Sequence, residues 1–316
     1  MITSFKGGVG KSTISVNLAI GFAVSKYKVL IIDIDASSGS IDLFMGCESD
    51  TIYNFCDVIE GKVKIEDAVY VKKSYFNPNR KNNFSNIANI ANIPNKLINL
   101  NNSDAPGNSA ASDKPDGADN TQEQPYYSVD VLKSPSSYDL TKFSDEEIKE
   151  FIKKAKEIYD FIIFDCPSGR FPFFDSLAKN TDYIFVITLH SAASIRSSEK
   201  MALFLSETGN DGEKVRLIIN CFNPKGISRG LNLGIVDIIE RSKIKLIGLI
   251  EINNMLRDYQ ELGKTAYDVR TRKLRRFFDD IIGRVLESNI ILNRKYDGIK
   301  TNNLYFKKEV KDTTKV

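Results

Sequence analysis

A glycine-rich segment near the start of the chain restricts the fold more than any other feature of the sequence. Residues 4–13 read Ser-Phe-Lys-Gly-Gly-Val-Gly-Lys-Ser-Thr and stand between an apolar run at 2–5 and a helical pattern. Gly7, Gly8 and Gly10 let backbone N–H groups turn inward around an anion, because no Cβ obstructs the approach. Strand, glycine-rich loop and helix in this order predict a phosphate-binding loop in a βαβ unit.

Further apolar runs, with helical patterns between them, predict the rest of the fold. Most of these runs have no polar face, which is typical of strands inside a parallel sheet that is covered on both sides. Predicted strands lie at 2–5, 28–33, 161–165, 183–188, 215–220 and 246–250, and predicted helices at 12–25, 145–158, 194–206, 233–239 and 274–286. Ser144 and Glu147 have the spacing of a capping box before the second helix. We therefore expect an α/β fold, a doubly wound and mostly parallel sheet with helices on both faces.

The chain predicts one domain with an insertion rather than two domains. Eleven of the 26 residues from Asn77 to Asn102 are Asn, and alanines are the only apolar side chains between Ser103 and Gln124. Such a segment buries too little surface to offset the entropy of ordering it, so we expect a disordered insertion at about 77–125. Strand and helix patterns on both sides of it assign 1–286 to a single domain, which a basic tail at 287–316 follows.

The net charge of the chain hides an asymmetry. The formal charge is +3, but the segment from Val269 onward holds thirteen Lys and Arg against six Asp and Glu, a net +7 that leaves −4 for the rest. A basic tail on an acidic body suggests contact with an anionic surface, either membrane or nucleic acid. A solvated tail is the simpler alternative.

Composition excludes several classes of protein. No apolar run reaches the roughly 18 residues that cross a bilayer, and no secretory signal is present, so we expect a cytoplasmic protein. The four cysteines are scattered without a C-x-x-C pair, which argues against a disulfide framework and against zinc or iron–sulfur sites.

The loop residues have separable chemical roles. Lys11 brings a positive charge to the β- and γ-phosphates, Ser12 offers a hydroxyl to Mg²⁺, and the helix N-terminus adds its partial positive charge. Lys6 is a second lysine at the start of the loop, and Phe5 stands where the ordinary motif has Gly.

This loop resembles the deviant Walker A loop of the MinD/ParA family of dimerising ATPases. The resemblance implies that the chain binds ATP and Mg²⁺ and forms an ATP-dependent homodimer, in which Lys6 reaches the nucleotide of the partner. The implied nucleotide-binding residues are Lys6, Gly7, Gly8, Val9, Gly10, Lys11, Ser12, Thr13 and Asn220. Asn220 is included because Asn220–Pro224 looks like the segment in which family members read adenine.

Two aspartates continue the resemblance. The segment Asp33-Ile-Asp35 looks like the family's switch I, where Asp35 would position the attacking water near the metal. Asp165, at the end of an apolar strand, resembles the Walker B aspartate that holds Mg²⁺ through water, although such a residue can also be a helix cap. The resemblance thus assigns catalysis to Lys6, Lys11 and Asp35, and the metal to Ser12, Asp35 and Asp165.

The amphipathic helix predicted at 274–286 has two interpretations. It is either the closing helix of the domain, packed on the sheet, or a membrane-binding helix of the kind that ends MinD-like proteins. We favour packing, because Asp279 and Asp280 on its polar face would meet anionic lipid unfavourably.

The resemblance implies an activity and two alternative roles. In the first, a MinD-like ATPase hydrolyses ATP to ADP and phosphate and controls placement of the division septum, or of another polar or membrane-associated assembly. It would sit peripherally on the inner face of the cell membrane and recruit a protein activator or effector. In the second, a ParA-like ATPase partitions DNA and binds it through the basic tail.

Overall fold

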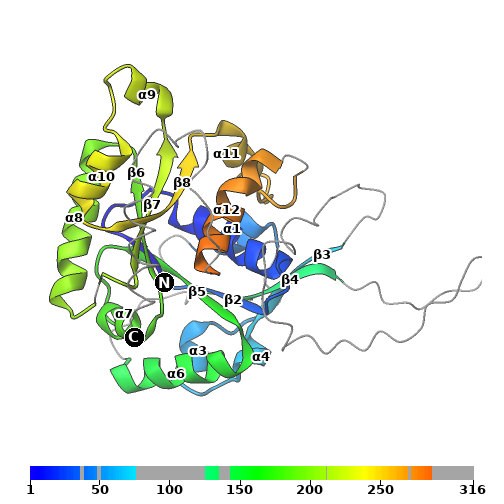
Figure 1. Cartoon of the computed structure of the whole chain (residues 1–316). Coiled ribbons are helices and arrows are strands. Elements are labelled where there is room, and N and C mark those ends of the chain that lie inside the picture. Colours follow the sequence, from blue (N-terminus) through cyan, green and yellow to red (C-terminus); the bar gives the residue numbers. More distant parts are fainter. Residues whose placement is uncertain are drawn as a thin grey trace, which may run out of the picture.

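The centre of the molecule is an eight-stranded sheet in the order β3-β4-β2-β5-β1-β6-β7-β8 (Figure 1). The computed structural model describes residues 1–35, 39–47, 51–75, 125–134, 143–210, 212–269 and 272–286. All neighbouring strands are parallel except the edge strand β3, so the doubly wound, mostly parallel sheet is confirmed. The strands are β1 Ile2–Ser4, β2 Val29–Asp33, β3 Tyr70–Tyr75, β4 Pro125–Leu132, β5 Phe161–Ser168, β6 Ile184–Leu189, β7 Val215–Phe222 and β8 Lys245–Glu251.

Helices of two kinds connect the strands. The five predicted helices correspond to the long helices α1 Lys11–Val24, α6 Asp145–Ile158, α8 Ala192–Glu207, α10 Ile235–Ser242 and α12 Arg272–Val285. The sequence did not predict the short ones, because one or two turns carry too little periodicity. These are α2 Ile41–Met45, α3 Phe55–Ile59, α4 Ile65–Ala68, α7 Phe174–Asn180, α9 Pro224–Ser228 and α11 Asn254–Gln260. The capping box of Ser144 and Glu147 is present at the start of α6.

Alternate residues of β2 enter different hydrophobic clusters, which shows that both faces of the sheet are covered. Leu30 and Ile32 belong to the cluster that includes residues of α3, α6, α7, α8 and α10, whereas Val29 and Ile31 belong to the cluster that includes residues of α1, α2, α11 and α12. Both pairs are fully buried. Two-sided burial explains why this strand is apolar at every position up to Asp33.

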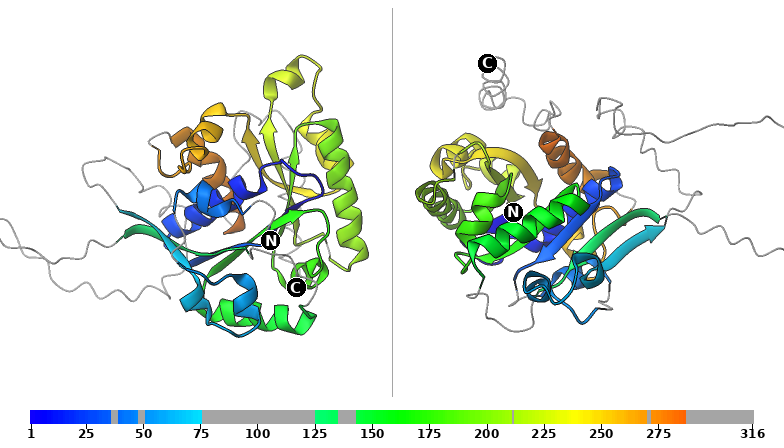
Figure 2. Two further views of the ribbon diagram at one scale, coloured as in Figure 1. Left: turned by 180° about the vertical axis from the view of Figure 1, so that it is seen from behind. Right: turned by 90° about the horizontal axis from the view of Figure 1, so that it is seen from below.

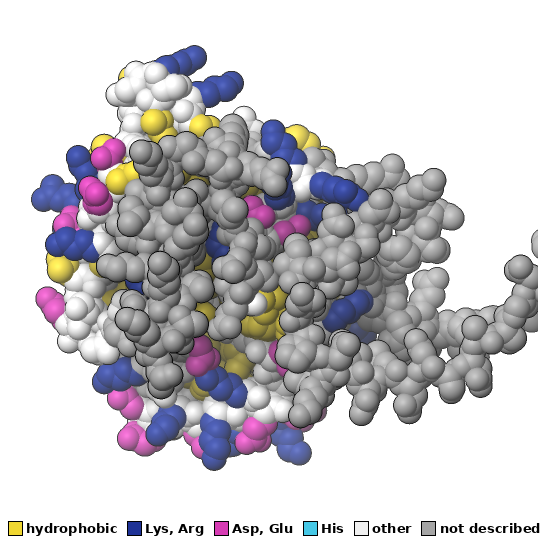
Figure 3. All heavy atoms as spheres, in the orientation of Figure 1, with side chains coloured by type: hydrophobic (Ala, Val, Ile, Leu, Met, Phe, Trp, Pro, Cys, Tyr) yellow, Lys and Arg dark blue, Asp and Glu magenta, His cyan; other side chains and the backbone are white. Residues whose placement is uncertain are grey.

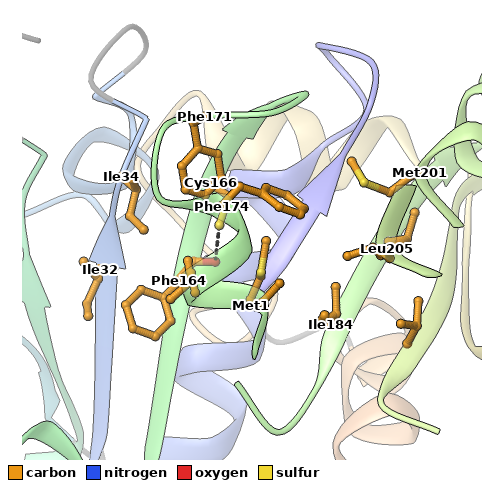
Figure 4. Close-up of a cluster of buried hydrophobic side chains, with 14 of the residues drawn as sticks. Met1, Ile32, Ile34, Phe164, Cys166, Phe171, Phe174, Ile184, Met201 and Leu205 are labelled. Carbon is orange, nitrogen blue, oxygen red and sulfur yellow. Dashed lines mark hydrogen bonds between the residues drawn. The ribbon is translucent and has the colours of Figure 1, made fainter. Parts of the chain in front are cut away.

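The first of these clusters extends to the centre of the sheet around Cys166 (Figure 4). Cys166 is fully buried with Phe164 and Phe174, and its Sγ lies 3.6 Å from the carbonyl oxygen of Phe164. Burial raises the pKa of this thiol far above its usual range. Cys166 is therefore a core residue, not a reactive thiol.

The edge of the sheet contains two strands that the sequence did not predict. Strand β3 pairs antiparallel with β4, and β4 pairs parallel with β2. The predicted insertion at 77–125 connects these two strands, but its last residue, Pro125, already begins β4. Residues 76–124 and the predicted tail at 287–316 lie outside the described residues. Assignment of 1–286 to one domain stays a prediction.

The amphipathic helix α12 packs on the sheet beside α1, as Figures 1 and 2 show. Its apolar residues Leu274, Phe278, Ile281 and Ile282 are buried. The contact is so close that a Cβ on Gly248 of β8 would collide with Ile281. The packed closing helix is thus the correct interpretation. In the part of the chain that the structure describes, no helix is long and apolar enough to cross a membrane.

We predict that Gly248→Ala destabilises the protein by about 1–3 kcal/mol, because the added Cβ would force the fully buried Ile281 to shift within a packed core. Gly212→Ala is the matched control, since a Cβ there meets nothing within 4 Å. It should change stability by less than about 0.5 kcal/mol. Urea unfolding of both variants measures the difference, and equal midpoints would refute the packing argument.

Candidate phosphate-binding site

The predicted phosphate-binding loop connects β1 to α1 at the carboxyl edge of the sheet. Gly8 and Gly10 adopt left-handed φ angles of 69° and 93°, and α1 begins directly after Gly10. The hydroxyl of Ser4 donates to the carbonyl of Lys6 at 2.7 Å, which orders the entry to the loop. Because α1 begins inside the motif, its free N–H groups lie at the loop and favour an anion there.

The two lysines of the loop differ in exposure. Lys6 is exposed, as are Gly7 and Gly8 beside it. Lys11 is only 7% exposed, and its ammonium group donates a 2.8 Å hydrogen bond to the hydroxyl of Ser168 at the end of β5. A buried cation therefore lies at the inside of the loop, and an exposed one lies at its outer surface.

Asp165 lies on β5 behind the loop, beside the first turns of α1. Ser15 donates a 2.8 Å hydrogen bond to Oδ1, whereas Oδ2 is buried with no hydrogen-bond partner among the described residues. Burial raises the pKa of Asp165 to about 6, while the nearby hydroxyls of Ser12 and Ser15 and the charge of Lys11 oppose the shift. One carboxylate oxygen thus has capacity for a further donor or a cation.

Asp33 and Asp35 follow on the neighbouring strand β2, where Asp33 pairs in register with Asp165. Burial raises the pKa of Asp33 to about 8, and the charge of Asp165 adds to the shift. Its carboxylate accepts the backbone N–H of Asp35 at 2.9 Å, which holds the turn that carries Asp35. Asp35 itself is half-buried, near enough that its charge raises the pKa of Asp165.

Asn220, predicted to contact adenine, is tied to the phosphate-binding loop. Its Nδ2 donates to the carbonyl of Val9 at 2.8 Å, and its Oδ1 accepts the N–H of Cys221 at 2.9 Å. A Cβ on Gly10 would collide with this amide. The structure brings Asn220 to the loop, and its contact with a base stays a prediction.

His190 supports the segment that follows Asn220. Its ring stacks on Phe222 with centroids 4.6 Å apart, Nδ1 accepts the N–H of Asn223, and Nε2 lies 2.8 Å from the carbonyl of Leu233. These contacts connect the end of β6 to the loops around α9. His190 therefore has a structural role, because its two ring nitrogens contact backbone groups.

The structure adds three residues that sequence reasoning did not assign. Ser15 lies one helical turn after Ser12, so the spacing alone signals a shared face. The sequence shows Asp33 as a carboxylate at the end of a strand, but it does not predict the hydrogen bond that Asp33 accepts from the backbone N–H of Asp35. Ser168 reaches Lys11 only because β5 lies next to β1, with Ser168 in register with Ser4.

Comparison with known families agrees with this arrangement. The family described as "CobQ/CobB/MinD/ParA nucleotide binding domain" matches residues 1–287. The chain therefore belongs to this family of nucleotide-binding domains. The septum site-determining protein MinD of Bacillus subtilis is 24% identical over 250 residues, which are 79% of this chain and 74% of that protein.

Two solved structures share the fold. The MinC:MinD cell division protein complex of Aquifex aeolicus aligns with a TM-score of 0.68 and 21% identity, over 93% of this chain and 97% of that one. The septum site-determining protein MinD of Pyrococcus horikoshii, complexed with Mg-ADP, aligns with a TM-score of 0.61 and 20% identity. That alignment covers 90% of this chain and 93% of the other.

We predict that Gly10→Ala prevents nucleotide binding without unfolding the protein, because a Cβ would strain the left-handed backbone and displace Asn220 from the loop. Gly230→Ala is the matched control, since Gly230 also has a left-handed φ, of 68°, but open space around it. Titration with a fluorescent ADP derivative measures binding. If Gly10→Ala binds with the affinity of the control, the loop is not the site.

Proposed function

We propose that the protein is a MinD-like ATPase, a nucleotide-dependent switch that dimerises with ATP and separates after hydrolysis. The observation that carries the proposal is the buried Lys11 at the inside of a glycine-rich loop, with the carboxylate of Asp165 behind it. Residues 6–13 would hold the phosphates. The relation to MinD proteins, one of which is described as complexed with Mg-ADP, supports this choice of ligand.

The residues present fit a magnesium ion. The unpartnered Oδ2 of Asp165 is a buried acceptor that a water bound to a cation would satisfy, and the hydroxyl of Ser12 lies near the same carboxylate. Oxygen ligands of this kind suit Mg²⁺, which keeps several waters when it binds a nucleotide. In this proposal Ser12 and Asp165 hold the metal, and the bound ion would neutralise charge on the phosphates.

Asp35 has the role of positioning the attacking water. Its backbone N–H donates to Asp33 at 2.9 Å, which fixes the position of its backbone at the carboxyl edge of the sheet. An oriented carboxylate can accept a hydrogen bond from water and so hold the water in one direction. As in the resemblance, Asp35 would also lie near the metal.

Lys6 has the role of contacting the nucleotide of a second copy. Its exposed position in the loop, in contrast to buried Lys11, leaves its side chain accessible to another molecule. Two like-charged lysines at one phosphate site would repel each other when no nucleotide is bound. Dimerisation should therefore require the negative charge of ATP.

We predict that Asp35→Ala binds ATP but hydrolyses it about 100-fold more slowly, because the water loses its orienting acceptor. The variant should therefore remain an ATP-bound dimer, as measured by light scattering after size-exclusion chromatography.

Lys6→Ala should bind ATP and remain monomeric, whereas Lys11→Ala should not bind nucleotide at all.

Lys153→Ala, on the exposed face of α6, is the control for removal of a lysine charge. It should behave as the unmodified protein in all three measurements. An Asp35→Ala protein that hydrolyses ATP at the normal rate would remove Asp35 from the proposed mechanism.

The proposed cellular role is placement of the division septum or of another membrane-associated assembly. We propose a cytoplasmic protein whose ATP-bound dimer contacts the inner face of the membrane peripherally and recruits a protein partner. The description of one structural neighbour as a MinC:MinD complex supports a protein partner. Because α12 is packed on the sheet, the membrane contact is assigned to residues 287–316, which hold seven Lys and Arg against four Asp and Glu.

DNA partitioning is the second candidate. Besides the basic tail, exposed basic residues, Lys225 and Arg229, lie in and directly after α9, where basic side chains project from the surface (Figure 3). Phosphate contacts from such residues would bind DNA without reading its sequence. The relation to MinD proteins makes the membrane role the preferred one.

We predict that the protein co-sediments with phosphatidylglycerol vesicles in ATP but not in ADP, because a dimer presents two tails to the surface. A variant that ends at Leu286 should lose this binding and retain ATPase activity. Retention on DNA that depends on nucleotide, without vesicle binding, would contradict the membrane role and favour partitioning.

A further inference from the structure

A pocket lies at the amino edge of the sheet, on the side opposite to the phosphate-binding loop. Strand β1 joins the sheet at Ile2, in register with Asp165 of β5 and Phe185 of β6. Because β5 already begins at Phe161, its first residues extend past β1 toward the amino edge. The starts of β5 and β6 therefore stand on either side of a space that no strand of the described residues fills.

The walls of the pocket are largely apolar, and its volume is about 210 Å³. Phe161 and Ile162 are half-buried, although the four residues that follow them in β5 are buried. Small-molecule sites usually have volumes above roughly 300 Å³, so a few aliphatic side chains suit this pocket better. Apolar side chains of both faces of the sheet line it, namely Leu18 of α1, Ile152 of α6, Val285 of α12, Phe161, Ile162 and Phe185.

The backbone of Ile162 faces this pocket. The N–H of Phe161 donates to the carbonyl of Lys28, and the carbonyl of Asp165 accepts from the N–H of Ile34, so both groups point toward β2. Backbone groups of successive residues in a strand alternate between its two neighbours, so those of Ile162 point to the opposite side, where β1 has not yet begun. An extended segment can therefore pair with this part of β5 by strand addition.

The chain leaves α12 at the same pocket. Val285, the last residue of α12, lines it, and Leu286 follows directly. The next apolar run is Ile290–Leu292, which three residues separate from Leu286. Four residue steps span about 13 Å in an extended chain, so this run is within reach of the pocket. The later apolar run Leu304–Phe306 would have to close a longer loop, at a higher entropic cost.

The charges around the pocket are compatible with this run. Arg294 and Lys295 follow it in the sequence. The exposed side chain of Asp160 lies at the rim of the pocket, where Asp182 already pairs with Lys156 at 3.0 Å. A basic pair beyond the docked run would therefore meet an acidic group.

We propose that residues 290–292 dock in this pocket and add a short strand between the starts of β5 and β6. The docked run covers the half-buried side chains of Phe161 and Ile162 and pairs with the backbone of Ile162. The rest of the tail then leaves the domain at the amino edge, away from the phosphate-binding loop. This docking depends neither on nucleotide nor on the proposed function.

Hydrogen exchange of the full chain, measured by mass spectrometry, tests the docking. Ile291→Asp places a charge in the docked run. It should make the amides of residues 161–163 exchange at least about tenfold faster, because the backbone of Ile162 loses its partner. Leu304→Asp is the matched control, since it makes the same kind of change in the later apolar run, and it should leave this exchange unchanged.

Photo-cross-linking identifies the occupant of the pocket. Benzoylphenylalanine in place of Asn293, next to the docked run, should cross-link to residues 159–163 or 180–183 of the same chain. In place of Asn303, next to the later run, it should not. A mixture of isotope-labelled and unlabelled protein separates cross-links within one chain from those between two copies.

Three results would overturn the proposal. The first is unchanged exchange at 161–163 in Ile291→Asp. The second is equal acceleration by Leu304→Asp, which would assign the pocket to the later run. The third is a cross-link from position 293 that joins two copies, which would make a second copy the occupant.

Discussion

Two carboxylates, those of Asp33 and Asp165, are buried in register at the ends of adjacent strands. The contacts of the site depend on the free-energy cost of burying these two groups. Burial of an unpaired charge costs several kcal/mol, so each carboxylate must find donors or lose its charge. Asp165 receives the hydroxyl of Ser15 and the field of Lys11, and Asp33 receives the backbone N–H of Asp35. The other oxygen of Asp165 has no partner among the described residues, and in the proposed function it accepts a water bound to the cation.

The order of the strands explains how distant segments reach this point. Strand β1 lies between β5 and β6, with β2 beyond β5, so the phosphate-binding loop adjoins strand ends from both later and earlier parts of the sheet. Ligands bind at such a position in open α/β sheets, because the loops diverge there and leave space. Lys11, Ser168 and Asp165 meet at this place through strand pairing, and flexible loops contribute little to their positions.

Close packing makes α12 part of the hydrophobic core. Helix α12 is held by the buried Ile281 against Gly248, and Arg284 of the same helix donates to the carbonyl of Ile247 at 2.8 Å. A helix so engaged cannot turn its apolar face to lipid without exposing the core. Amphipathic periodicity alone could not decide this, since a packed helix and a membrane-bound helix need the same apolar stripe.

The sequence by itself determined the elements whose signals are local. The phosphate-binding loop could be predicted because phosphate binding requires glycines at 7, 8 and 10 and the lysine at 11 at one fixed spacing. Strand β2 could be predicted because burial on both faces makes a strand apolar along its length. Strand β4, which lies between β2 and the edge strand β3, was missed, because its alternating pattern in Ser128–Asp130 follows a long Asn-rich segment and because it pairs with distant β3.

Only the tertiary structure decided which side chains meet. Ser168 contacts Lys11, Asp33 holds Asp35, and Asn220 binds the loop at Val9, and each contact depends on strand register or on a turn conformation. The chemistry available to a residue depends on its own side chain. Its neighbours across a sheet, however, are set by pairing between strands that are far apart in the chain.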